Sequence, residues 1–70
     1  MARIKREQDR DEKRDEIVAA ARQLFVEEGY EATSISRLAS AAGVAANTIY
    51  WYFKDKDEVL VAVLDAELSA

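Results

Sequence analysis

The sequence contains no cysteine, no histidine and no proline, and only two glycines among its 70 residues. Without cysteine the chain has no disulfide and no thiolate metal site, and without histidine it lacks the commonest zinc ligand and the commonest general base. No apolar run approaches the roughly 20 residues of a membrane span, and the charged N-terminus is no signal peptide. We therefore expect a soluble intracellular protein with no metal, no cofactor and no membrane contact.

The net charge of −4 argues, as a total, against a nucleic-acid partner, because the phosphate backbone attracts positive charge. The distribution of the charge is more informative. The first 16 residues carry six basic and six acidic side chains, and the negative excess lies mainly in residues 54–70. A nucleic-acid role must therefore depend on local geometry rather than on the total charge.

The spacing of apolar residues predicts a first helix over about 12–28. Its apolar face repeats with the 3.6-residue period of an α-helix and consists of Ile17, Ala20, Ala21, Leu24 and Phe25. Gly29 should end this helix in the left-handed conformation and bring Tyr30 against Phe25. The charged residues 1–11 are expected to form a frayed arm.

Three further helices are expected, at about 35–42, 46–52 and 56–69. Thr33 or Ser34 can cap the first of these, and Gly43 should end it. An Asp55–Glu58 capping box opens the last helix. Since no strand pattern is present, the sequence predicts an all-α fold.

The last of these helices has more apolar surface than a small core needs. Its expected core face consists of Val59, Leu60, Val63 and Leu64. Val61 and Leu68 lie on another face, and such an exposed apolar strip indicates a missing partner surface.

Only about three residues join the helices expected at 35–42 and 46–52, and so short a connection makes two helices cross steeply. The corner needs a small residue where the helices touch and a residue with positive φ at the turn. It also needs an apolar residue on the second helix that packs inward and fixes that helix, which we call the apolar lock. Ala39, Gly43 and Ile49 supply these at positions i, i+4 and i+10. This is the spacing of the DNA-binding helix-turn-helix, whose second helix enters the major groove. A helical corner without a ligand is the alternative.

Polar and aromatic side chains dominate the expected outer face of the helix at 46–52. They are Ala46, Asn47, Thr48, Tyr50 and Trp51. Asn can read adenine, Thr can donate to a base or contact a thymine methyl, and Tyr hydroxyls suit phosphates. Packing of Tyr50 and Trp51 within the protein is the competing interpretation.

The segment from Ile17 to Leu60 resembles the N-terminal domain of the TetR/AcrR family of transcriptional regulators. The resemblance lies in the runs IVAAARQLFVEEGYEATSISRLASAAGVA and TIYWYFKDKDEVL, whose combination is highly specific. It implies a homeodomain-like, three-helix helix-turn-helix head over 12–70, including the start of a fourth, linking helix. It also implies that this chain is a fragment of a longer regulator, whose C-terminal ligand-binding domain it lacks.

The resemblance further implies a set of DNA contacts. Base edges or the groove would be met by Ser36, Arg37, Ala46, Asn47, Thr48, Tyr50 and Trp51. Phosphates would be met by Thr33, Ser34, Tyr52 and Lys56. For Lys54 a solvated charge is an equal alternative. Ala45 departs from the family, which often has a capping Ser there, and the change removes roughly 1 kcal/mol of capping from the helix that follows.

The same resemblance implies a function and partners. The protein would be a repressor in the bacterial cytoplasm, associated with the nucleoid when bound and released from DNA by a small-molecule ligand. Its partners would be double-stranded DNA with a palindromic operator and, in the full-length parent, a second copy in a homodimer. The fragment alone is expected to be monomeric or to associate weakly.

Two other classes of function compete with this interpretation. A helical protein-interaction module could use Tyr50 and Trp51 as its hot spots, and it would shift no DNA duplex. An enzyme is poorly supported, because the sequence has no catalytic His or Cys, no Gly-rich phosphate loop and no nucleophile elbow. A calcium loop starting at Asp55 is excluded, because Leu60 occupies the position that requires Gly.

Overall fold

The structure, a computed structural model, describes the backbone of residues 2–69 and the side chains of residues 12–68. Over that part of the chain it contains four helices and no strand, which confirms the all-α prediction. The helices are α1 (Ala2–Glu27), α2 (Ile35–Ala42), α3 (Ala46–Tyr52) and α4 (Lys56–Ser69). None of these helices combines the length and the apolar character required to cross a membrane.

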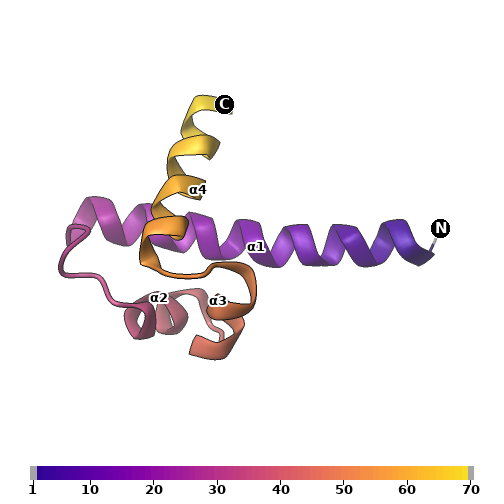
Figure 1. The fold of residues 1–70 in the computed structure, drawn as a ribbon, viewed down its shortest axis with the longest axis horizontal. Coiled ribbons are helices and arrows are strands. Elements are labelled where there is room, and N and C mark those ends of the chain that lie inside the picture. The colour runs from indigo at the N-terminus through magenta and orange to yellow at the C-terminus, as the bar shows by residue number, and fades with distance from the viewer. Residues whose placement is uncertain (1, 70) are drawn as a thin grey trace.

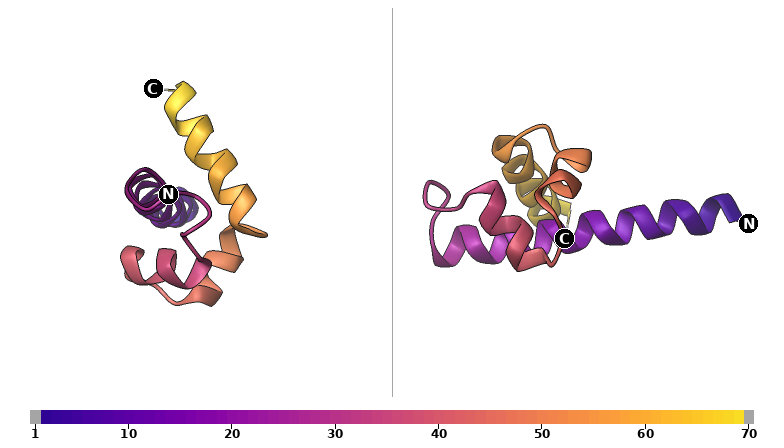
Figure 2. Two further views of the ribbon diagram at one scale, coloured as in Figure 1. Left: turned by 90° about the vertical axis from the view of Figure 1, so that its left-hand side faces the viewer. Right: turned by 90° about the horizontal axis from the view of Figure 1, so that it is seen from below.

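The long α1 forms the axis on which the other helices are arranged (Figure 1). Helix α1 packs against both α2 and α4, and α2 packs against α3. Figure 2 includes a view along α1, in which α2 and α4 lie against different sides of it and α3 lies farther out. Helix α4 crosses α1 at a steep angle, and its C-terminal end points away from α2 and α3.

The first helix is longer than expected, because α1 begins at Ala2 rather than near residue 12. The segment 2–11 has no Gly or Pro and consists largely of Ala, Arg, Lys, Glu and Gln, which are good helix formers. Residues expected to fray therefore continue the helix in the structure. The ranges of α2, α3 and α4 coincide with those expected.

Helix α1 ends at Gly29 as predicted, with φ of 92°. The Gly29 N–H donates to the Phe25 carbonyl at 3.1 Å, the single hydrogen bond of the left-handed ending. The rings of Phe25 and Tyr30 meet edge to face with centroids 5.2 Å apart. The expected contact across the helix end is confirmed.

The core draws on all four helices. Each helix contributes one large side chain that is completely buried, namely Ile17, Leu38, Ile49 and Val59. Packed around them, each at most 8% exposed, are Val18, Ala21, Leu24, Ala39, Phe53, Ala62 and Val63. Full burial of an Ile, Leu or Val side chain contributes about 1.5–3 kcal/mol relative to leaving it in water. Each helix is thus anchored to one shared interior.

The core face of α4 differs from the one predicted. Ala62 is buried at 5% exposure, whereas Leu64, expected in the core, is 52% exposed, and Leu60 is only half-buried. The buried residues follow the spacing i, i+3 and i+4 from Val59, because α4 meets α1 at a steep angle and along a narrow line. Beyond Val63 the apolar side chains Leu64 and Leu68 are exposed.

The start of α4 is capped nearly as predicted. Asp55 Oδ1 accepts from the Glu58 N–H at 3.0 Å, and Glu58 Oε1 accepts from the Lys54 N–H at 2.8 Å. The Glu58 side chain therefore reaches one residue further back than the capping box requires. Nearer its other end, α4 is joined to α1 by an ion pair between Glu67 and Arg22, whose Oε2 and Nε lie 2.5 Å apart.

Candidate nucleic-acid interface

The corner between α2 and α3 is held by a hydrogen-bonded turn at Gly43. The Val44 N–H donates to the Ala39 carbonyl at 2.9 Å, and the Gly43 N–H donates to the Ser40 carbonyl at 3.2 Å. These two bonds form a Schellman motif, which requires the left-handed conformation at Gly43, and its φ is 74°. On the far side of the corner Ile49 is completely buried. The predicted arrangement of small residue, left-handed residue and apolar lock is therefore present.

This lock determines which side of α3 faces outward. Asn47, Tyr50 and Trp51 are exposed at positions i, i+3 and i+4, and we call them the outer stripe of α3. Tyr50 is 54% exposed and Trp51 is 74% exposed. Thr48 and Ala46 lie at the edges of the stripe and are half-buried, with Ala46 packed partly against the core. The two aromatic side chains are thus not packing residues of this domain.

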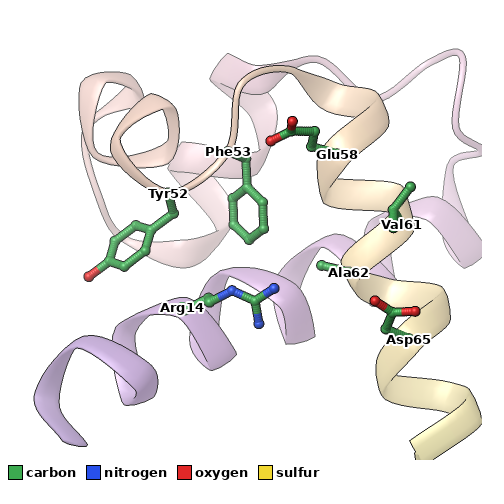
Figure 3. Close-up of a pocket in the computed structure, with 7 residues that line it drawn as sticks. All are labelled: Arg14, Tyr52, Phe53, Glu58, Val61, Ala62 and Asp65. Atoms are coloured by element: carbon green, nitrogen blue, oxygen red, sulfur yellow. The ribbon is translucent and has the colours of Figure 1, made fainter. Parts of the chain in front are cut away.

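Tyr52 and Phe53 at the end of α3 point in different directions. Figure 3 shows the Phe53 ring directed toward α1, whereas the Tyr52 ring points away from α4 with its hydroxyl outermost. Phe53 is buried, and the Arg14 guanidinium lies 5.3 Å from its ring centroid. Tyr52 is half-buried, so its hydroxyl remains available at the border of the outer stripe.

A cleft of about 410 Å³ lies between α1, the end of α3 and α4 (Figure 3). Its lining consists of Arg14, Tyr52, Phe53, Glu58, Val61, Ala62 and Asp65. No residue of the outer stripe contributes to it. The cleft is therefore separate from the surface that α3 presents to solvent.

The start of α2 brings two serines to the surface and buries a threonine. Ser34 caps the helix, its Oγ accepting from the Arg37 N–H at 3.0 Å, and Ser36 is exposed. Thr33, predicted to meet a phosphate, is completely buried, and its hydroxyl donates to the Gly29 carbonyl at 2.8 Å. The Thr33 side chain thus stabilises the loop between α1 and α2 and presents nothing to a ligand.

Arg37, predicted to reach the groove, forms a bidentate ion pair with Glu28, the residue directly after α1. Nη2 lies 2.7 Å from Glu28 Oε2, and Nε lies 3.3 Å from Oε1. This hydrogen bonding lowers the pKa of Glu28 and raises the pKa of Arg37. The groove beside Arg37 is lined by Ala20, Gln23, Leu24, Glu27 and Ala41, which belong to α1 and α2. The guanidinium therefore points to the α1 side of α2 and away from the outer stripe.

Lys56, also predicted to contact a phosphate, is engaged within the protein. Its Nζ donates to the Tyr30 carbonyl at 2.7 Å and lies 4.1 Å from the centroid of the Tyr30 ring. The Tyr30 hydroxyl donates in turn to the Asp57 carboxylate. This cluster fastens the loop after α1 to the start of α4. Lys54 is exposed and follows the outer stripe at i+7 from Asn47, so it is the better placed of the two lysines for a phosphate.

Sequence reasoning missed the internal partners of these side chains. The sequence alone does not indicate that Glu28 meets Arg37 or that Arg14 lies over the Phe53 ring. The sequence does contain one indication of an ion pair between the first two helices. Glu27 and Glu28 lie at the end of the predicted first helix, and Arg37 is the one charged residue of the second. Only the crossing of α1 and α2 shows which of the two glutamates meets Arg37.

Comparisons with known proteins agree with this architecture. The sequence profile described as bacterial regulatory proteins, tetR family, matches residues 17–63. The regulator AcrR of Shigella flexneri is 44% identical over 69 residues, which are 99% of this chain and 32% of AcrR. The regulator HbdR of Aromatoleum sp. (strain CIB) is 44% identical over 54 residues, 77% of this chain and 24% of HbdR.

A solved structure is also similar. The fatty acid degradation regulator FadR from Bacillus halodurans superposes with a TM-score of 0.78 at 42% identity, over 81% of this chain and 30% of FadR. The chain thus spans about a quarter to a third of the length of these relatives. Since the family profile covers most of the sequence, the chain belongs to the TetR family of bacterial transcriptional regulators and contains its helix-turn-helix DNA-binding domain.

Proposed function

We propose that this chain binds double-stranded DNA in a sequence-dependent manner, with α3 in the major groove and the start of α2 beside the flanking phosphates. The major groove of B-DNA admits an α-helix, and the second helix of a helix-turn-helix is the one that enters it. One observation carries the proposal. A seven-residue helix whose inner side is locked by Ile49 presents an amide and two large aromatic side chains to solvent.

The neighbouring polar groups support this orientation. Ser34 and Ser36 at the start of α2 are exposed, and Thr48 borders the outer stripe. Hydroxyls of this kind hydrogen-bond to phosphate oxygens and fix the register of a protein on the duplex. The Tyr52 hydroxyl and the Lys54 ammonium can do the same from the other end of α3. Each DNA-facing group proposed here is therefore on α2, on α3 or directly after α3.

The charge of the chain limits how strongly one copy binds. Between Glu31 and Lys54 the sequence has a single charged residue, Arg37, and Glu28 engages it. Since each neutralised phosphate contributes about −0.9 to the slope of log affinity against log salt, we expect weak binding and a shallow slope for one head. A two-fold homodimer on a palindromic operator would raise the affinity, because one bound head increases the effective concentration of the other.

The proposal extends to the role of a longer regulator. Relatives about three times the length of this chain are transcriptional regulators. We infer repression in the bacterial cytoplasm, relieved by a small molecule bound in a regulatory domain outside residues 1–70. Dimerisation in that regulator would likewise be provided outside these residues, and the 70-residue chain would be monomeric or weakly associating.

The test is fluorescence anisotropy of labelled duplexes titrated with wild-type protein and with Trp51→Ala, at two salt concentrations. Val26→Ala is a matched control, because Val26 on α1 is 75% exposed and Trp51 is 74% exposed. Trp51→Ala should weaken binding while Val26→Ala should not, and both variants should fold. A chain that shifts no duplex at low salt would instead indicate a protein-interaction surface.

A further inference from the structure

The chemistry of the outer stripe restricts which bases it can read. Helix α3 has the sequence ANTIYWY and thus carries no guanidinium, ammonium or carboxylate group. Resting on the DNA binding proposed above, we propose that the half-site is read through A·T base pairs. Asn47 pairs with an adenine, and the rings of Tyr50 and Trp51 pack on the methyl groups of neighbouring thymines.

Each base pair presents different groups in the major groove, and different side chains match them. Guanine is read most often by Arg or Lys through O6 and N7, and cytosine by Glu or Asp through its amino group. Adenine is matched by the amide of Asn or Gln, and the thymine methyl by apolar surface. The outer stripe supplies one exposed amide and two aromatic rings, which correspond to adenine and thymine.

The cations near α3 do not change this assignment. Arg37 is turned toward α1 by its two contacts with Glu28, at 2.7 and 3.3 Å. Lys56 is held on Tyr30 at 2.7 Å. Lys54 lies beyond the end of α3, in the loop after Phe53, where it is placed for a phosphate rather than for a base edge. No described cation is therefore placed to read guanine.

The order of residues along α3 gives the expected order of bases. Asn47 is in the first turn, and Tyr50 and Trp51 follow three and four residues later on the same side. At 1.5 Å per residue this separation is about 5 Å along the helix axis. Base pairs are stacked about 3.4 Å apart, so the thymines should lie roughly one or two base pairs from the adenine.

The experiment has two stages, both with the 70-residue chain. Bound duplexes are first selected from a random pool at low salt. Affinities are then measured by anisotropy for the selected duplex, for a copy with the adenine pair changed to G·C, and for a copy with uracil in place of thymine. The protein variants are Asn47→Ala, Asn47→Arg and, as a control on α1, Gln23→Ala.

We expect the change to G·C to weaken wild-type binding by about five- to a hundredfold, the range of one bidentate base contact. Asn47→Ala should remove that discrimination, and Asn47→Arg should reverse it in favour of guanine. Loss of one thymine methyl should weaken binding by about fourfold. Gln23→Ala should behave as wild type.

Three results would overturn the proposal. They are a wild-type preference for G·C at the position that Asn47 variants alter, an unchanged preference in Asn47→Arg, and full affinity for the uracil duplex. In each of these the chain still binds DNA, so the function proposed above survives. Failure to bind any duplex would refute both proposals together.

Discussion

Replacing Gly43 by alanine isolates the contribution of the left-handed corner between α2 and α3. A Cβ built at Gly43 meets no atom within 4 Å, so the substitution introduces no steric clash. The change acts through the backbone, because φ is 74° at this position and L-residues with a Cβ disfavour that region. Any loss of stability therefore measures the conformational requirement of the corner.

The magnitude follows from two opposing effects. The left-handed conformation costs a residue with a Cβ about 1–2 kcal/mol, and the stiffer unfolded chain of alanine offsets about 0.4–1 kcal/mol of this. We expect a net destabilisation of about 1 kcal/mol, which lowers Tm by about 4–8 °C in a domain of this size. Gly43→Asn should lose less, because Asn adopts this conformation more readily than alanine does.

Urea unfolding followed by circular dichroism gives the free energy of unfolding, and anisotropy gives DNA affinity. Gly29→Ala is the matched control, because φ is 92° there and its Cβ is also unobstructed. The two variants should lose similar stability, but only Gly43→Ala should weaken DNA binding in the folded protein, since Gly43 sets the direction of α3. If Gly43→Ala unfolds at the wild-type urea concentration, or if Asn is as disruptive as Ala, the reasoning is refuted.

Three further predictions concern the core, a helix cap and an ion pair. Ile49→Ala should reduce the free energy of unfolding by about 2–5 kcal/mol, because Ile49 is completely buried; a loss below 1 kcal/mol in urea unfolding would contradict its role as the lock of the corner. Ala45→Ser should raise stability by about 1 kcal/mol, since the present N-cap of α3 makes no side-chain hydrogen bond; an unchanged Tm would show that a serine there does not cap. The Arg37 hydrogen bond lowers the pKa of Glu28 below its ordinary value of 4.5, so the ion pair stabilises the protein above that value and its contribution is lost as pH falls through the lowered pKa. The stability difference between wild type and Glu28→Gln should accordingly be present at pH 7 and shrink as the pH falls below 4.5 through the lowered pKa, and a pH-independent difference would exclude this linkage.

The corner and the outer side of α3 could be predicted because they depend on local rules. The spacing from Ala39 to Ile49 determines which residues meet at the turn, and Gly43 is the one residue there that tolerates positive φ. Once Ile49 faces inward, the 3.6-residue period places Asn47 and Tyr50 on the opposite side. These predictions needed no knowledge of the other helices.

The side-chain positions that the sequence did not predict depend on contacts between distant segments. Two hydroxyls precede α2, and only the position of the loop beneath them shows that Thr33 is buried while Ser34 caps the helix. The group that a long cationic side chain contacts likewise depends on which carboxylate or carbonyl the fold brings near it, as Glu28 is brought near Arg37. Leu64 was expected on the buried side of α4 but lies on another side of the helix from Val59 and Ala62. Which side is buried depends on how α4 crosses α1, and no local pattern encodes that crossing.

The burial of Val59, Ala62 and Val63 means that α4 is itself part of the helix-turn-helix unit. A chimeric regulator that joins this head to a foreign sensor domain should therefore place its junction after Val63, because an earlier junction would open the interior to water. Because Val59 and Ile49 belong to one shared core, a change in the tilt of α4 would disturb the packing that holds α3.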